Sequence, residues 1–257
     1  MKIGVLDLLC EDATRSLFRM PHEFFVVKQY AGIMPQAVSV WCRNIGHHVH
    51  YATYYGQKDP VTLLPDDLDV IFMSCFSRSS GLAYALAKCF KMKRPKILTV
   101  LGGPHAKQFS SDALRFFDVV VQDCDQTLIR EILQNFPQKS IVTTSRKLKD
   151  IPGIEERLPE IKIAGFWRSK PTPFAFIPIL SSTGCPFSCD FCVDWNTPYN
   201  PLPLERVERD LLFAATHFPQ IRINFYDPNF GVKFDQIMTV IEKYPTPGND
   251  GFLRKGL

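Results

Sequence analysis

The stretch Lys96-Ile-Leu-Thr-Val-Leu-Gly-Gly-Pro104 holds a short apolar run that ends in two glycines and a proline. A run of this length and character is typical of a strand that is buried on both faces. The run Asp69–Cys75 (DVIFMSC) has the same character, and a helical pattern at Leu82–Met92 separates the two. Because strands that alternate with helices form parallel sheets, this stretch predicts an α/β fold.

The alternation continues in both directions from this stretch. It predicts a doubly wound, mostly parallel sheet over residues 1–136. The further strands expected there are Ile3–Leu9, Val49–Tyr54 and Val119–Val121. The further helices expected there are Gln36–Asn44, Asp112–Phe117 and Thr127–Asn135.

Residues 137–173 contain recurring prolines and little periodicity, so they are predicted to be a linker with a short strand near Ile141–Thr144. A second unit is expected over residues 174–257, again with strands that alternate with helices. Its expected elements are the strands Phe174–Leu180 and Ile221–Tyr226 and the helices Leu204–Thr216 and Phe234–Lys243.

The bulk composition limits the classes of protein to which the chain can belong. The formal charge of +4 over 257 residues is too mild to indicate nucleic-acid binding. No stretch approaches the roughly 20 apolar residues of a membrane span. We therefore expect a cytoplasmic protein in a reducing compartment, where clustered cysteines are metal ligands or reactive thiols more often than disulfides.

Three of the eight cysteines, Cys185, Cys189 and Cys192, form a C-x3-C-x2-C run directly after an apolar strand. Reactive sites in parallel α/β folds lie at the carboxyl ends of strands. Electron-transfer cubane clusters usually have four cysteine ligands. The spacing therefore predicts a [4Fe-4S] cluster with three thiolate ligands and one iron left open, on a loop that Gly184 and Pro186 shape.

Two other interpretations of this loop stay open. A structural zinc site would need a fourth ligand, which Asp190, Asp194 or the distant Cys124 could supply, whereas His217 falls at the end of a predicted helix. The three cysteines could also lie together by chance.

With Phe191 just before the last cysteine, the run resembles the signature of the radical S-adenosylmethionine (radical SAM) enzymes. The resemblance implies that the cysteines hold the cluster and that S-adenosylmethionine chelates the open iron. It also implies reductive cleavage of S-adenosylmethionine to a 5′-deoxyadenosyl radical, fed by an electron donor of the flavodoxin or ferredoxin type. Phe191 would lie near the adenine, and the other interpretation of this ring is core packing.

The segment Ile221–Phe230 (IRINFYDPNF) resembles the strand that follows the first helix in these enzymes. The resemblance implies that Asp227 and Asn229 face the cofactor from the carboxyl end of the strand. Turn formation around Pro228 is the other interpretation of both residues.

The N-terminal domain resembles the Rossmann-like cobalamin-binding domain that precedes many radical SAM cores. The matching elements are Ser74–Ser80, Gly102–Ala106 and Gln122–Leu128. No D-x-H-x-x-G motif occurs, so no histidine is expected to ligate cobalt. For His105, an ordinary loop histidine is favoured over a catalytic role, although the ring could still line the cofactor site. The residues that this resemblance places at the cofactor are Ser74, Gly102, Gly103 and His105.

The resulting functional hypothesis is a radical SAM enzyme, including methyl transfer through cobalamin, with its substrate and catalytic residues unassigned. From Cys185 to Leu257 the chain has 73 residues, room for about two βα units of a partial (βα)6 radical SAM barrel. The alternative is therefore a non-catalytic fragment that binds the cluster or cobalamin and needs a partner chain. A third, weaker hypothesis is a protein stabilised by zinc.

Overall fold

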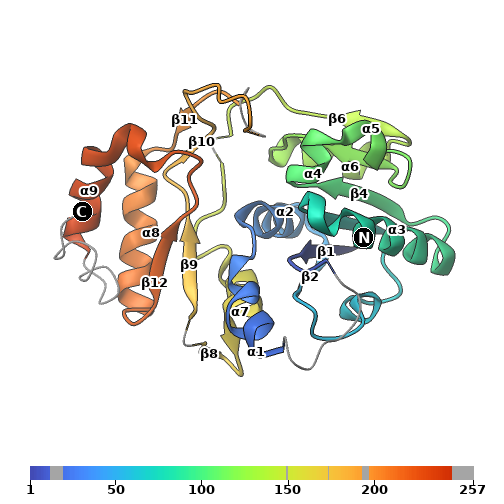
Figure 1. Ribbon diagram of the computed structural model, residues 1–257, viewed down its shortest axis with the longest axis horizontal. Helices are drawn as coiled ribbons and strands as arrows, with labels where there is room; N and C mark the ends of the chain where they lie inside the picture. Colours follow the sequence, from blue (N-terminus) through green and yellow to red (C-terminus); the bar gives the residue numbers. More distant parts are fainter. Residues whose placement is uncertain (12–19, 149, 173, 193–196, 245–257) are drawn as a thin grey trace. The chain divides into compact units, whose positions relative to one another are not determined.

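A computed structural model describes the chain over residues 1–11, 20–148, 150–172, 174–192 and 197–244 (Figure 1). The chain divides into two compact units, Met1–Arg146 and Lys147–Leu257. The domain limits predicted from the sequence, 1–136, 137–173 and 174–257, stay predictions. Asp194 and the tail 245–257 lie outside the described residues.

The first unit is built on a six-stranded sheet in the order β2-β1-β3-β4-β5-β6, and every neighbouring pair is parallel. The strands are β1 (Lys2–Leu8), β2 (His48–Tyr54), β3 (Val70–Cys75), β4 (Leu98–Gly102), β5 (Val119–Val121) and β6 (Ser140–Val142). Its helices are α1 (Met20–Phe25), α2 (Ile33–Asn44), α3 (Ser80–Lys93), α4 (Pro104–Gln108), α5 (Ser110–Ala113) and α6 (Gln126–Asn135), with short 3-10 turns η1 (Val27–Tyr30), η2 (Pro60–Leu63) and η3 (Ser77–Ser79).

Both faces of this sheet are covered, which explains why its strands are apolar throughout. On one face, Ile71, Met73 and Leu101 belong to a buried cluster with Leu86 and Phe90 of α3. On the other face, the strands meet α2 and α6, which also contact each other. The sheet is therefore the core of the unit (Figure 1).

The strands expected in this unit are confirmed to within two residues, and α3 and α6 lie where helices were expected. The expected helix Asp112–Phe117 is wrong in its bounds, because two short helices, α4 and α5, precede and overlap it. The strand expected at Ile141–Thr144 is β6, which pairs with β5 at the edge of the sheet.

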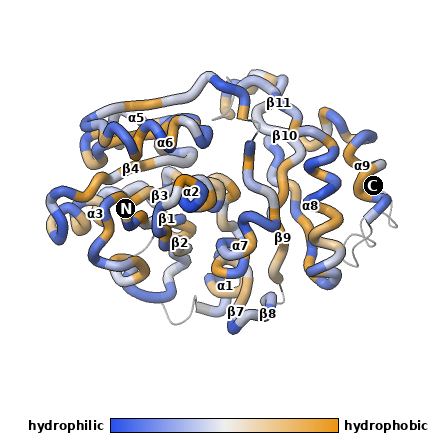
Figure 2. The backbone as a smooth tube through the Cα atoms, turned by 180° about the vertical axis from the view of Figure 1, so that it is seen from behind, coloured by the Kyte–Doolittle hydropathy of each residue, from blue (hydrophilic) through white to orange (hydrophobic). Residues whose placement is uncertain are grey.

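The second unit contains a βαβ arrangement. Strand β9 (Phe176–Ile179) pairs in parallel with β12 (Arg222–Phe225), and α8 (Leu204–His217) connects them. Helix α9 (Phe234–Lys243) packs with α8 over Ile179. Apolar and polar stretches alternate along α8 in Figure 2, as expected for a helix with one buried face.

Smaller elements complete the second unit. They are α7 (Leu158–Gly165), the antiparallel pairs β7 (Phe166–Trp167) with β8 (Lys170–Pro171) and β10 (Ser182–Thr183) with β11 (Asn200–Pro201), and the turn η4 (Phe230–Lys233).

The predicted fold class is thus confirmed at the level of a mixed α/β chain with a Rossmann-like parallel sheet. The partial barrel is not shown, since the described part of the second unit has only β9 and β12 as a parallel pair. Within the described ranges, no helix combines the length and the apolar character that a bilayer crossing needs.

Candidate functional site

The strand order of the first unit places a topological switch point between β1 and β3, because the chain leaves β1 for β2 on one side and β3 for β4 on the other. Open α/β sheets bind ligands outside the carboxyl ends of the strands at such a point. Three residues lie in register there, since Asp7 of β1 is opposite Ser74 of β3 and Ser74 is opposite Gly102 of β4. Residues in register on parallel strands share a face. We call Asp7, Ser74 and Gly102 the carboxyl-edge row.

Asp7 is the least expected member of the row. Its side chain is only 3% exposed, and its carboxylate accepts a 2.7 Å hydrogen bond from the Gly32 N–H. Burial raises the pKa of Asp7 to about 7, although hydrogen bonds from Gly32 and Ser74 act in the opposite direction. A carboxyl group that titrates near neutrality at a ligand-binding edge is a functional-site candidate.

Gly102 leaves the row open on one side. A Cβ atom placed on Gly102 would have no neighbour within 4 Å. An apolar cavity of about 60 Å³ lies here, bounded by Ser74, Gly102, Gly103 and Cys124 and by side chains of α2 and α6. Ser74, Gly102 and Gly103 thus line one cavity, while their contact with a cofactor stays a prediction.

Gly103 serves a different purpose from Gly102. Its φ is +90°, and a Cβ there would lie 3.0 Å from the Cys75 carbonyl oxygen and 3.1 Å from the Cys75 nitrogen. The residue lets the β4 end pass closely against the end of β3, which is a role that only glycine fills easily.

Replacing Gly103 by alanine should therefore destabilise the first unit by about 1–3 kcal/mol through left-handed strain and contact with the β3 backbone. The matched change Gly102→Ala should cost under about 0.5 kcal/mol, because its Cβ meets open space. Urea unfolding of both variants tests this, and equal losses at the two positions would contradict it.

His105, which was predicted to line the site, is buried in α4 and held at both ring nitrogens. Its Nε2 lies 2.6 Å from the Tyr84 hydroxyl and its Nδ1 lies 3.1 Å from Ser77 Oγ. Burial lowers the pKa of His105, so the ring is held towards its neutral form. His105 thus lies in a short helix and not in a loop, while its place at a cofactor stays a prediction.

A larger depression of about 490 Å³ lies at the opposite, amino end of the sheet, lined by Lys2, His48, Asp67, Asp69 and Arg94. Its charged groups pair with each other, Lys2 with Asp67 and Arg94 with Asp69. Because parallel sheets place their ligand sites at the carboxyl edge, we do not assign it a function.

In the second unit, the loop after β9 carries the three clustered cysteines. Cys189 is exposed, Cys185 and Cys192 are half-buried, and the Cys192 N–H donates to the Cys189 carbonyl at 3.1 Å in a turn. Among the described residues, no group of three or more His, Cys, Asp or Glu side chains is arranged to hold a metal ion. The loop thus has the sequence spacing of a ligand set without the convergence of side chains.

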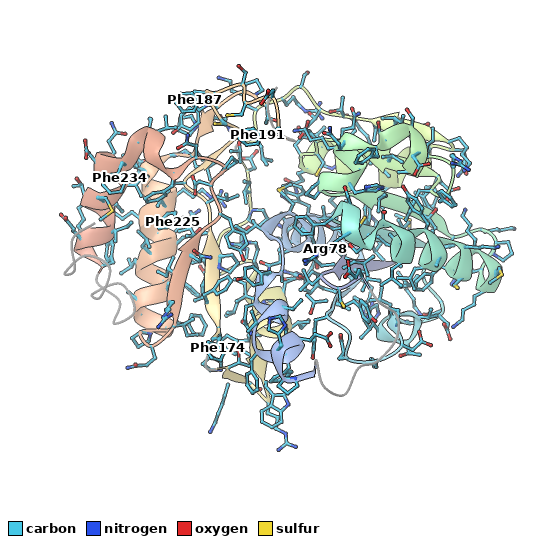
Figure 3. All side chains as sticks on the ribbon, viewed as in Figure 1. Arg78, Phe174, Phe187, Phe191, Phe225 and Phe234 are labelled. Atoms are coloured by element: carbon cyan, nitrogen blue, oxygen red, sulfur yellow. The ribbon has the colours of Figure 1, made fainter. Side chains whose placement is uncertain are left out.

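Two aromatic rings of this loop, Phe187 and Phe191, face solvent (Figure 3). Phe191 is 89% exposed, which rules out the core-packing interpretation of this ring. Its contact with S-adenosylmethionine stays a prediction.

Asp227 holds the start of the loop. Its carboxylate accepts hydrogen bonds from the Ser181 N–H at 3.0 Å and from the Ser181 and Ser182 hydroxyls at 2.6 Å each. The bonds tie the chain after β12 to the chain after β9. Asn229 caps the η4 turn through the Gly231 N–H and approaches Cys185 Sγ at 3.9 Å. The turn-forming interpretation therefore holds for Asn229, and a cofactor contact of Asp227 stays a prediction.

Two known proteins with distant similarity to this chain are named as methyltransferases. A 2-(S-pantetheinyl)-carbapenam-3-carboxylate methyltransferase of Streptantibioticus cattleyicolor is 25% identical over 193 residues, which cover 65% of this chain and 28% of that protein. An uncharacterized methyltransferase of Pyrococcus horikoshii is 22% identical over 193 residues, which cover 64% of this chain and 40% of that protein. The chain thus spans less than half the length of either relative. No family model matches it.

These findings correct the identification as a radical SAM enzyme. The relatives are named as methyltransferases, and the described cysteines do not form a site for a [4Fe-4S] cluster. Three expectations that depended on this identification lose their support. They are the reductive cleavage of S-adenosylmethionine, the cobalamin-dependent reaction, and the alternative of a fragment that binds the cluster or cobalamin. The physical reason for the error is that spacing along a loop does not fix where side chains point. An electron donor remains an untested expectation.

Proposed function

We propose that the chain is part of an S-adenosylmethionine-dependent methyltransferase and that its first unit binds the methyl donor at the carboxyl-edge row. The names of both relatives support the reaction class. The single structural observation that carries the placement is the open side of Gly102, in register with Ser74 and Asp7 at the switch point of the sheet.

The residues present suit such a donor. S-adenosylmethionine combines a cationic sulfonium, an amino group and a carboxylate with ribose hydroxyls and an adenine ring whose faces are apolar. The row offers the Asp7 carboxyl, the Ser74 hydroxyl and, in the cavity, the apolar walls of Val5, Val38 and Phe72. A small-molecule site usually encloses about 300–1,000 Å³. Since the cavity holds about 60 Å³, most of the donor would lie along the edge of the sheet rather than inside it.

When bound, S-adenosylmethionine supplies an electrophilic methyl group on its sulfonium. The part of this chain is to bind and orient the donor. Gly102 allows close approach of the ligand to the strand ends. Ser74 offers a half-buried hydroxyl, and Asp7 offers a carboxyl group whose charge depends on pH near neutrality. The methyl acceptor is unassigned.

Replacing Gly102 by valine tests the placement. Valine suits a strand, and its branches would fill the open side of the row without meeting a protein atom at the Cβ position. We expect S-adenosylmethionine affinity, measured by isothermal titration calorimetry, to fall at least about tenfold, which corresponds to about 1.4 kcal/mol. The thermal midpoint should stay near that of the wild type.

Gly231→Ala is the control, because it adds a methyl group to the second unit where only Asn229 Oδ1 lies nearby, at 3.4 Å. It should leave the affinity unchanged. Wild-type affinity in Gly102→Val would contradict the placement, and failure of the wild-type chain to bind S-adenosylmethionine at millimolar concentration would contradict the function.

A further inference from the structure

Four side chains at the carboxyl edge of the first unit form a continuous hydrogen-bonded chain. Ser77 Oγ lies 3.1 Å from His105 Nδ1, and Tyr84 Oη lies 2.6 Å from His105 Nε2. The Tyr84 hydroxyl also lies 2.9 Å from Asp112 Oδ2. The members come from four different elements, namely η3, α3, α4 and α5.

The direction of each hydrogen bond in this chain follows from the bond between Tyr84 and Asp112. The Asp112 carboxylate only accepts, so the single Tyr84 hydroxyl proton is donated to Asp112. Tyr84 Oη must then accept from His105 Nε2–H. A neutral imidazole with a proton on Nε2 has a bare Nδ1, which accepts the proton of Ser77. The tautomer of His105 is therefore inferred from the network.

This direction is the one that a nucleophilic serine needs. In serine nucleophiles, a neutral histidine accepts the hydroxyl proton, and an acidic group on the far side of the ring orients the imidazole and stabilises its charged form. Here Asp112 acts on His105 through Tyr84. Burial favours the neutral ring by lowering the pKa of His105, while the Asp112 charge opposes this effect.

The surroundings of Ser77 also suit the role. His105 is 5% exposed, whereas Ser77 is exposed at the start of a turn that leads into the 14-residue helix α3. The Ser79 and Ser80 N–H groups at the start of α3 donate to the Phe76 and Ser77 carbonyls, and these bonds shape the turn that carries Ser77. Arg78, which is labelled in Figure 3, follows Ser77 in the chain, and its Nη2 donates a 3.0 Å hydrogen bond to the Leu9 carbonyl. Ser77 thus stands exposed on a turn that these bonds fix, beside the buried His105 ring.

We propose that Ser77 is a nucleophile activated by His105, and that it accepts an acyl group from an activated ester or thioester. Ser77 Oγ bonds to the acyl carbon, the bond from that carbon to the leaving oxygen or sulfur breaks, and the hydroxyl proton passes to His105 Nδ1. The imidazolium then gives that proton to the leaving group. Tyr84 and Asp112 are positioning residues that act through His105.

A fluorophosphonate probe tests the proposal on the whole chain. Its phosphorus takes the place of the acyl carbon: the Ser77 Oγ–phosphorus bond forms, fluoride leaves, and the proton goes to His105. We expect one adduct per chain, located at Ser77 by peptide mass spectrometry. Ser77→Ala should abolish the adduct. His105→Gln should slow labelling at least about 100-fold, the usual contribution of a general base.

Tyr84→Phe keeps the ring that stacks on Phe116 at 4.1 Å and removes only the link between His105 and Asp112. It should slow labelling at least about tenfold while the fold is retained, which keeps the test decisive if a His105 variant fails to fold. Ser140→Ala, in the edge strand β6, is the control and should label like the wild type.

Three outcomes would overturn the proposal. The first is an adduct that persists in Ser77→Ala. The second is labelling of Ser77 at the wild-type rate in both His105→Gln and Tyr84→Phe. The third is a folded chain that labels no faster than the chain unfolded in urea. Acylation and S-adenosylmethionine binding have separate readouts, so either can fail without the other.

Discussion

Replacing Asp7 by asparagine is expected to remove about 4 kcal/mol of pH dependence from the stability of the first unit. Burial raises the pKa of the Asp7 carboxyl from 3.8 to about 7, and a pKa difference of about three corresponds to about 4 kcal/mol. Between these two pH values the folded protein keeps a proton that the unfolded chain has released. Stability from this group is therefore complete below pH 3.8 and is lost as the pH rises to about 7.

The measurement is hydrogen exchange of the β1 and β3 amides, which follows the opening of the first unit alone, at pH values from 4 to 8. The stability difference, wild type minus Asp7→Asn, should fall by about 4 kcal/mol across this range. Ser74→Ala removes a hydrogen bond that favours the charged Asp7 carboxylate, so it should raise the pKa of Asp7 further. The loss of stability should then continue to a higher pH than in the wild type. Parallel curves for the wild type and Asp7→Asn would contradict a raised pKa of Asp7.

The strands of the first unit were predictable because a buried parallel strand leaves a local signature, a short apolar run between turn residues. The short helices were not. Helix α4 begins at Pro104 directly after two glycines, which reads as a turn. Helix α7 spans Leu158–Gly165 within a proline-rich stretch, yet Pro159 stands in its first turn, where a missing N–H costs nothing. Both helices were therefore hard to predict, because the glycines and prolines at their starts are also typical of turns.

The residues of the candidate site also differ in how far the sequence could point to them. Ser74, Gly102 and His105 were named through the resemblance to a cobalamin-binding domain, and their contact with a ligand stays a prediction. Asp7 is visible in the sequence only as a carboxylate that interrupts an apolar strand. Tyr84 and Asp112 carried no such signal, because their contact with His105 depends on how three helices pack.

At the cysteine loop, the sequence carries a strong signal that the structure does not bear out. Its spacing is highly specific, but coordination depends on the direction of three side chains, which the backbone after Gly184 sets. Gly184 has a φ of +66°, and a Cβ there would meet the Pro198 carbonyl. The loop is therefore fixed at its start by a backbone contact that no ligand-spacing pattern describes.

The other large effect is expected in the second unit, at a buried arginine. Arg157 is 1% exposed, and its guanidinium donates to the carbonyl oxygens of Pro152 at 2.8 Å and Pro178 at 2.9 Å. It also lies near Asp210, which is 6% exposed and accepts from the Ile154 N–H at 2.9 Å. Burial raises the pKa of Asp210, while the Ile154 N–H and the Arg157 charge favour the ionised form.

Arg157→Met should lower the free energy of unfolding of the second unit by about 3–5 kcal/mol. It removes the guanidinium donors to the Pro152 and Pro178 carbonyls and the most buried of the cations near Asp210. Arg209→Met is the matched control: Arg209 is also an arginine near Asp210 but is exposed on α8, so its loss should cost under about 1 kcal/mol. Adding Asp210→Leu to Arg157→Met should cost less than the sum of the two single changes, since the orphaned carboxylate goes with it. Hydrogen exchange of the β9 and α8 amides gives the free energy of unfolding of the second unit in Arg157→Met, Arg209→Met, Asp210→Leu and the double variant. Equal small losses for Arg157→Met and Arg209→Met would show that the buried guanidinium does not hold this unit together.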